Sequence, residues 1–156
     1  MRENYKFVCK GFNELSVFEL YEIVKARYEV FVCEQEITCE NDFDDKDKKC
    51  KHLFIIDNKE GLENIIAYCR LLPPGLSYDE ASIGRVLTLK NYRNKGLAKE
   101  LMLKAIEEIK SNYNSNNITL SAQSYIKNLY ISVGFEVVSE EYEEARIPHI
   151  KMKFRI

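Results

Sequence analysis

The chain has 156 residues, a formal net charge of −2 at pH 7, and 46% hydrophobic against 31% charged residues. This length suffices for a sizeable core, so residues 1–156 are expected to form a single domain. A slightly acidic balance argues against broad electrostatic binding to nucleic acid, which needs a basic face. No apolar run approaches the ~20 residues of a membrane span, so no membrane partner is expected.

The cysteines and the N-terminal segment bear on the cell compartment. The five cysteines are an odd number without a C-x-x-C pair. We therefore expect reduced thiols rather than a disulfide framework or a zinc site, and no bound metal. The N-terminal segment MRENYKFV lacks the apolar core of a signal peptide. Together these features favour a cytoplasmic protein.

The first predicted elements are a strand and a helix. Residues 5–10 predict a short strand with Phe7 and Cys9 on one side. Residues 16–19 match a capping box, so a helix is expected to begin there. The segment 27–35, RYEVFVCEQ, is expected to close this helix and lead into a loop. The apolar stripe of the helix is predicted at Val17, Leu20, Tyr21, Val24, Tyr28 and Phe31.

A strongly acidic segment follows at residues 40–47, ENDFDDKD. It lacks the turn glycine and final glutamate of a calcium loop. Two interpretations stay open: a solvated surface loop, or an electronegative lip that attracts a cationic amine.

Three strands are predicted next, at residues 52–57, 65–72 and 83–89. Breakers separate them, at residues 58–61 and 73–75. The connections are too short for crossovers, so these strands should form an antiparallel meander.

The stretch after the third strand combines a basic loop with an amphipathic helix. Residues 91–96 supply the loop, and apolar residues then recur at helical spacing: Ala98, Leu101, Met102, Ala105 and Ile109. A helix that begins after a basic, glycine-containing loop offers unpaired N–H groups to an anion, most often a phosphate. The loop is neither G-x-x-x-x-G-K-[ST] nor G-x-G-x-x-G. The alternative is an ordinary helix start with surface Arg and Lys.

The C-terminal third predicts a strand at 118–122, a short helix at 125–133 stopped by Gly134, and paired strands at 135–138 and 150–154. The fold class is therefore α+β, a mixed sheet with helices on its faces.

Several motifs together resemble one superfamily. R-x-x-G-x-A at residues 93–98 and NLYISVGF at 128–135 are similar to the acyl-CoA segments of the GNAT (GCN5-related N-acetyltransferase) superfamily, in the same order. VFVCEQ at 30–35, IGRV at 83–86 and YEEARIPHIKM at 142–152 resemble its ElaA-like branch. Arg146 departs from the glycine usual there, which bears on the local turn.

The resemblance implies a mostly antiparallel GNAT sheet with helices on both faces, and acetyl-CoA as cosubstrate without a metal. The pantetheine arm would lie along a strand as an added strand does. The residues implied to bind the cosubstrate are Val86, Leu87, Thr88, Arg93, Asn94, Lys95, Gly96, Leu97, Ala98, Lys99 and Asn128.

The reaction implied is direct attack of a primary amine on the acetyl thioester. An alkylamine with pKa near 10.4 is mostly protonated at pH 7, and forming the free amine costs about 4.6 kcal/mol. Some group must therefore take a proton from it. His149 or Glu34 would be this base, although a structural hydrogen bond is an alternative for each. Tyr130 is the phenol implied to protonate the leaving thiolate, and without the motif it would be a core aromatic. A backbone N–H of residues 86–88 would bind the oxyanion.

The expected function is an acetyl-CoA-dependent N-acetyltransferase for a small-molecule or peptidyl amine. The resemblance also allows a homodimer. Two rivals remain, a non-catalytic acyl-CoA-binding module of the same fold and an ATP-binding protein. Arg85 and Gln123 would either line the acceptor pocket or tie loops together, and His52 is interpreted as structural.

Overall fold

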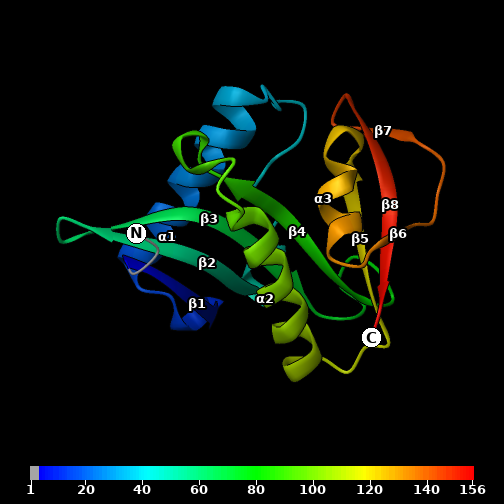
Figure 1. The fold of residues 1–156 in the computed structure, drawn as a ribbon, viewed down its shortest axis with the longest axis horizontal. Coiled ribbons are helices and arrows are strands. Elements are labelled where there is room, and N and C mark those ends of the chain that lie inside the picture. The colour runs from blue at the N-terminus through cyan, green and yellow to red at the C-terminus, as the bar shows by residue number, and fades with distance from the viewer. Residues whose placement is uncertain (1–3) are drawn as a thin grey trace.

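The computed structural model describes residues 4–156. Residues 1–3, which belong to the N-terminal segment MRENYKFV discussed above, lie outside the described residues. One mixed sheet runs through the described chain in the order β1-β2-β3-β4-β5-β8-β6, with β7 beside β8 (Figure 1). The strands are β1 (Tyr5–Gly11), β2 (Lys51–Lys59), β3 (Leu62–Leu72), β4 (Ala81–Thr88), β5 (Asn117–Gln123), β6 (Glu136–Val137), β7 (Tyr142–Glu144) and β8 (Ile147–Arg155).

The strand pairing confirms the predicted α+β class. The three strands β2, β3 and β4 form the expected antiparallel meander, and β6 pairs with β8 as predicted. β1 extends the meander by pairing antiparallel with β2. The β4–β5 pair is parallel, because α2 (Leu97–Asn112) lies between these strands in the chain. The sequence analysis missed β7, whose three residues are too few for a period to show.

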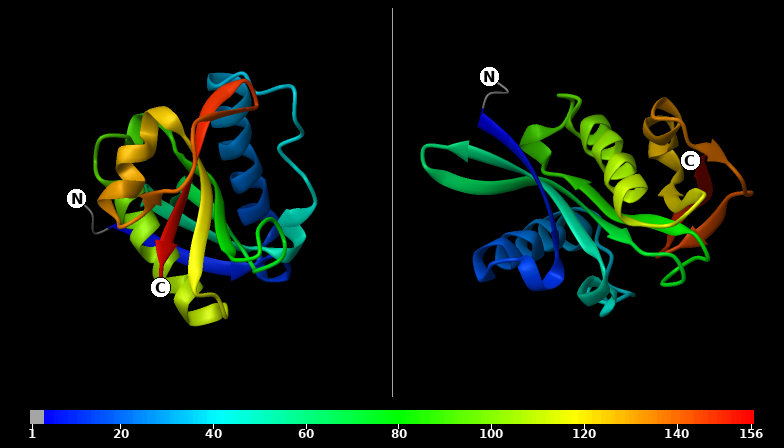
Figure 2. Two further views of the ribbon diagram at one scale, coloured as in Figure 1. Left: turned by 90° about the vertical axis from the view of Figure 1, so that its right-hand side faces the viewer. Right: turned by 90° about the horizontal axis from the view of Figure 1, so that it is seen from below.

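Helices cover both faces of the sheet (Figure 2). One face carries α2 and α3 (Lys127–Ser132), and the other carries α1 (Val17–Arg27). The alternation of β2 supplies both cores, because Leu53 and Ile55 join the α2 side while Phe54 and Ile56 join the α1 side. None of the helices within residues 4–156 has the length and apolar character to span a membrane.

The helix starts agree with their sequence signals. Ser16 caps α1 through its side chain, which accepts from the amide of Glu19, and the Glu19 side chain accepts from the amide of Ser16. In α2 the predicted face is buried at Leu101, Met102, Ala105 and Ile109, while Ala98 is half-buried. Gly134 follows the end of α3 and has φ +106, a conformation that favours glycine. A Cβ at this position would also meet the Phe154 ring.

The predicted apolar stripe of α1 is wrong. Val17, Tyr21 and Tyr28 are 87%, 66% and 55% exposed, and Leu20 is also exposed. Only Phe31 of the predicted stripe is buried, and Val24 is half-buried. The buried face instead carries Glu22, Ile23, Ala26 and Arg27. The hydrophobic pattern could not find this face, because it includes a charged arginine, Arg27, whose partners lie elsewhere in the chain.

After α1 the chain does not pass directly into a loop. It continues as the π-helical segment η3 (Tyr28–Glu34), which has Gln35 as its C-cap residue and buries Val30 and Phe31. The predicted helix at 125–133 is a short 3₁₀ turn (Ser124–Ile126) followed by α3. The five cysteines lie within the described residues and form no disulfide.

Candidate functional site

A cavity of about 890 Å³ opens where β4 and β5 separate. These parallel strands pair only at Ala81–Ile118 and Ser82–Thr119. Beyond Ser82 the β4 edge therefore has no strand partner on the β5 side, and the cavity occupies this gap. Its lining includes the later half of β4, the start of α2, α3, the β7–β8 hairpin and the segment after η3.

β4 contains a β-bulge in the part that lines the cavity. Gly84 faces Arg70 and Leu87 faces Tyr68, so two β4 residues, Arg85 and Val86, oppose the single residue Cys69. Arg85 has φ +54, the left-handed conformation typical of a bulge residue. The Thr88 Oγ1 is buried and has no hydrogen-bond partner within residues 4–156. A ligand amide could supply this missing partner.

The 93–99 loop presents main-chain donors at the start of α2. Gly96 is the N-cap residue with φ +80, and Asn94 is also left-handed with φ +62. The first helical hydrogen bond runs from the amide of Glu100 to the carbonyl of Gly96, 3.2 Å. Within the described residues, the amides at 96–99 donate to no other group. These amides and the helix dipole suit an anion.

The cationic side chains of this loop differ in their placement. Arg93 lines the cavity, but its side chain is bound to other parts of the protein. Its Nε donates to the Thr88 carbonyl at 2.9 Å, and its terminal nitrogens bind both oxygens of Glu34 at 2.9 and 3.0 Å. Lys99 lines the cavity. Lys95 is exposed, with its Nζ 5.3 Å from the centre of the Tyr92 ring, and it does not line the cavity.

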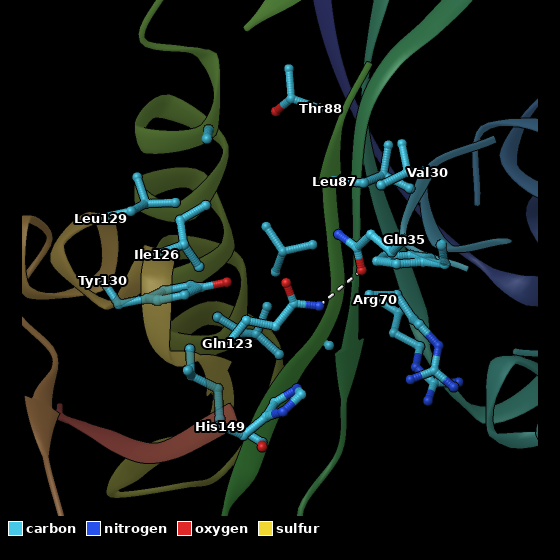
Figure 3. A pocket seen from close by; sticks show the side chains of 18 of the residues that line it. Val30, Gln35, Arg70, Leu87, Thr88, Gln123, Ile126, Leu129, Tyr130 and His149 are labelled. Atoms are coloured by element: carbon cyan, nitrogen blue, oxygen red, sulfur yellow. Dashed lines mark hydrogen bonds between the residues drawn. The ribbon is translucent and has the colours of Figure 1, made fainter. Parts of the chain in front are cut away.

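Tyr130 brings a phenol to the cavity from α3. Its ring is buried and packs edge-on against Phe135, with the ring centres 6.1 Å apart. The hydroxyl points from α3 toward β4 (Figure 3), and within residues 4–156 it has no hydrogen-bond partner. Burial, with smaller effects of Cys69 and Tyr125, raises the pKa of Tyr130. The phenol therefore stays protonated at neutral pH.

Two glutamines cross the cavity below Tyr130. Gln123 Nε2 donates to Gln35 Oε1 at 2.9 Å, which joins β5 to the end of η3 (Figure 3). Gln123 thus both lines the cavity and ties two segments together. Sequence reasoning missed Gln35 as its partner, since 88 residues separate them.

His149 lies on the far side of this bridge and is buried on β8, directly opposite Tyr142 of β7. Its Nδ1 lies 2.7 Å from the Ile147 carbonyl, and its Nε2 lies 3.3 Å from Glu144 Oε2. The residues Ser121, Tyr142 and Glu144 around it were not singled out from sequence. The only sequence signal for them is the two-residue spacing of Tyr142 and Glu144 within YEEARIPHIKM, which would place both side chains on one face of a strand.

The acidic segment 40–47 is solvated only in part, since Glu40, Asn41 and Asp45 are exposed. Its other aspartates are paired with arginines and do not form an open electronegative lip. Arg27 binds Asp42 at 2.8 Å and Asp47 at 2.7 Å. Arg70 donates hydrogen bonds to both carboxylate oxygens of Asp44, at 2.6 and 2.7 Å. Arg85 pairs with Asp42 at 2.7 Å. We call these six residues the arginine–aspartate cluster, namely Arg27, Arg70, Arg85, Asp42, Asp44 and Asp47.

The cluster is charge-balanced, with three arginines and three aspartates. Arg27 and Arg70 are almost fully buried, so the predicted lip is replaced by an internal ion-pair network. His52, as expected, is structural: it is buried, its Nε2 donates to the Asp47 carbonyl at 2.9 Å, and its Nδ1 accepts from the Tyr68 hydroxyl at 2.7 Å. Burial lowers the pKa of His52.

The structure thus brings most of the predicted site together. One cavity is lined by Val86, Leu87, Thr88, Arg93, Asn94, Gly96, Leu97, Ala98, Lys99, Tyr130, His149 and Glu34. Lys95 and Asn128 do not line it, and Asn128 lies on an exposed part of α3. The roles of all these residues stay predictions.

This mixed sheet, whose parallel strands β4 and β5 separate beyond Ser82, is that of the GNAT acyltransferase fold. Comparison with known proteins agrees: residues 39–156 match the acetyltransferase (GNAT) domain family, and the chain belongs to this family. A UPF0039 protein of Schizosaccharomyces pombe is 40% identical over 154 residues, covering 98% of this chain and 99% of the relative.

Within the family the chain falls in the ElaA-like branch. ElaA of Escherichia coli is 35% identical over 141 residues, covering 90% of each chain. The crystal structure of an acyl-CoA N-acyltransferase from Pseudomonas aeruginosa superposes with a TM-score of 0.84 at 32% identity, covering 96% of this chain and 99% of that one. These comparisons confirm the predicted family and fold.

Proposed function

We propose that this acyltransferase moves an acetyl group from acetyl-CoA to a primary amine of a small molecule or peptide. The observation that supports this proposal is the meeting, in one cavity, of free main-chain donors at 96–99, an unpaired β4 edge and the Tyr130 hydroxyl. The P. aeruginosa relative, an acyl-CoA N-acyltransferase by name, has the same fold. We propose a cytoplasmic location, and we keep the homodimer as a prediction.

The residues present fit acetyl-CoA. The diphosphate of the cosubstrate would accept from the amides at 96–99, with Lys99 adding charge at the rim. The pantetheine arm would pair with the edge of residues 86–88, where the Thr88 hydroxyl lacks a partner. Arg93 supports this site through Glu34 and the Thr88 carbonyl rather than by direct contact.

The protein would assist the transfer in three ways. A main-chain N–H at the β4 bulge would donate to the oxygen of the reacting carbonyl. The Tyr130 hydroxyl, protonated because burial raises its pKa, would give a proton to the leaving thiolate. His149 would take a proton from the amine. We prefer it to Glu34, because Arg93 already binds both oxygens of Glu34.

The test is release of free thiol from acetyl-CoA with a panel of primary amines. We expect turnover by the wild type and a ~100- to 10,000-fold lower kcat in Tyr130→Phe, since general acid catalysis is worth that much. Acetyl-CoA should still raise the melting temperature of this variant. Tyr21→Phe, on the exposed face of α1, is the matched control and should keep full activity.

The same experiment separates the two rivals. A binding module would be stabilised by acetyl-CoA but would release no thiol with any amine. An ATP-binding protein would be stabilised by ATP and not by acetyl-CoA. Equal turnover by wild type and Tyr130→Phe would contradict the role of this phenol.

A further inference from the structure

The cavity reaches both faces of the sheet. Tyr130 belongs to the core on the α2 face. Cys69 and Leu71 of β3 point into the same core, so Arg70 between them points to the α1 face. Tyr130 and Arg70 both line the cavity, and Figure 3 shows them on opposite sides of β4. The groups proposed to hold the cosubstrate thus lie on the α2 face, and the α1 face is left to the acceptor.

The guanidinium of Arg70 has one donor without a partner. Its terminal nitrogens donate to Asp44 at 2.6 and 2.7 Å and to Asp47 at 3.1 Å. Its Nε is buried and makes no hydrogen bond within residues 4–156, and the whole residue is only 3% exposed. A buried charged donor is costly to leave unpaired. An acceptor atom that enters from the cavity would satisfy it.

Gly84 keeps this donor accessible from the cavity. It lines the cavity opposite Arg70, and an added Cβ would lie 3.6 Å from Arg70 Nε. Gly84 is not among the left-handed glycines of the described chain, and its added Cβ would make only ordinary van der Waals contacts. Neither backbone conformation nor a clash therefore requires glycine here. Its effect is to leave the space over Arg70 Nε open.

Two further cationic residues converge on the same aspartate. The Lys46 amide donates to Asp44 Oδ1 at 3.2 Å, and Arg85 Nη2 lies 3.5 Å from Asp44 Oδ2. The Lys46 ammonium donates to Ser77 Oγ at 2.8 Å and forms no ion pair within residues 4–156. Arg85 Nε lies 2.7 Å from Asp42 Oδ1 but lacks a well-aligned hydrogen bond. Lys46 and Arg85 both line the cavity, so donors surround this end of it.

The charge at this end favours a single negative charge on the ligand. Within the described residues, the buried unpartnered side-chain atoms of the arginine–aspartate cluster are nitrogens. The cluster itself is neutral, so Lys46 adds one positive charge, and lysine and arginine are both cationic at pH 7. The other carboxylates that line the cavity form no ion pair with these cations in residues 4–156, namely Glu34, Glu40 and Glu144. A carboxylate supplies one charge and two acceptor oxygens.

Resting on the acetyltransferase function proposed above, we propose that the amine acceptor also carries a carboxylate, which binds Arg70 Nε and the Lys46 ammonium. The substrate class is thus an amino acid rather than a simple alkylamine or a polyamine. Its carboxylate lies on the α1 face, and its amine reaches through the gap between β4 and β5 toward the thioester. A diamine would instead bring a second ammonium against Lys46 and Arg85.

The test measures dissociation constants by ¹H–¹⁵N NMR titration with saturating CoA, so it needs no turnover. The probes are ω-amino acids from glycine to 6-aminohexanoate, with n-alkylamines and α,ω-diamines of the same chain lengths as comparisons. We expect at least one chain length at which the amino acid binds about tenfold or more tightly than the matched alkylamine, since hydrogen bonds to charged groups are the stronger ones. The diamine should bind no better than the alkylamine.

Two variants assign this preference to the proposed contacts. Lys46→Gln removes the ammonium, and Gly84→Ala places a methyl group over Arg70 Nε without a clash. Each should reduce the preference for the amino acid about fivefold or more and leave alkylamine binding unchanged. Lys48→Gln is the matched control and should keep the wild-type preference, because Lys48 pairs with the exposed Asp45 and does not line this cavity.

Three outcomes would overturn the inference: no chain length at which the amino acid is preferred, tightest binding by a diamine, or an unchanged preference in both Lys46→Gln and Gly84→Ala. Thiol release from acetyl-CoA is measured separately. Turnover of alkylamines and amino acids at equal rates would reject the carboxylate site and keep the acetyltransferase function. A carboxylate preference in binding without thiol release would do the reverse.

Discussion

Two charged regions contribute to the lining of the cavity, and they differ in how far their polar groups are paired. The 93–99 loop leaves main-chain donors free within the described residues. The arginine–aspartate cluster pairs all of its side-chain charges internally. The sequence makes both segments look like ligand-binding sites, one basic and one acidic. The first region keeps unpaired main-chain donors, whereas the acidic side chains of the second are paired with arginines. Charge density in the sequence alone therefore does not identify a binding region.

The largest expected effect comes from opening the cluster. Arg27→Ala would leave Asp42 and Asp47 without the buried guanidinium that binds them. Breaking a buried ion pair in this way costs about 3–5 kcal/mol. The free energy of unfolding by urea measures it. Lys48→Ala, which removes an exposed ion pair with Asp45, is the control and should leave the free energy of unfolding nearly unchanged. Similar losses for both variants would mean that the cluster is not a structural core.

The second-largest effect is expected from a substitution in the 93–99 loop. Gly96 has φ +80, so Gly96→Ala costs about 1–2 kcal/mol of backbone strain and places a methyl group beside the free amides. We expect acetyl-CoA affinity, measured by calorimetry, to fall about tenfold or more. Gly61→Ala carries similar strain at φ +76 in the open β2–β3 turn and should leave the affinity unchanged. A loss in both variants would attribute the effect to stability rather than to the loop.

A pH titration sharpens the comparison further. Burial alone would raise the pKa of Asp44, but the hydrogen bonds and charge of Arg70, with the charge of Arg85, hold it well below its ordinary 3.8. A depressed pKa gives stability that is complete above the unfolded value and is lost as the pH falls toward the folded one. The stability gap between wild type and Asp44→Asn should therefore shrink between about pH 5 and pH 2. A constant gap would contradict the ion pair.

The smallest effect concerns a left-handed residue outside the ligand loop. Arg146 has φ +62 and follows Ala145 at φ +50 in the two-residue turn between β7 and β8. Arg146→Gly should raise the free energy of unfolding by up to about 1 kcal/mol, because glycine accepts this conformation without a Cβ penalty. Arg146→Lys keeps the charge and should be neutral. A destabilised glycine variant would show that the arginine side chain has a structural role.

The sequence by itself determined the strands of the meander, the capping box at Ser16, the α2 start and the family. These features depend on local spacing and on residues close together in the chain. Tertiary structure decided which face of α1 is buried, because Arg27 can enter the core only once Asp42 and Asp47 fold over it. It also decided that Arg93 binds Glu34, and that Glu144 lies against His149. Such side-chain pairs join strands and loops that only the folded sheet brings together, so no local pattern records them.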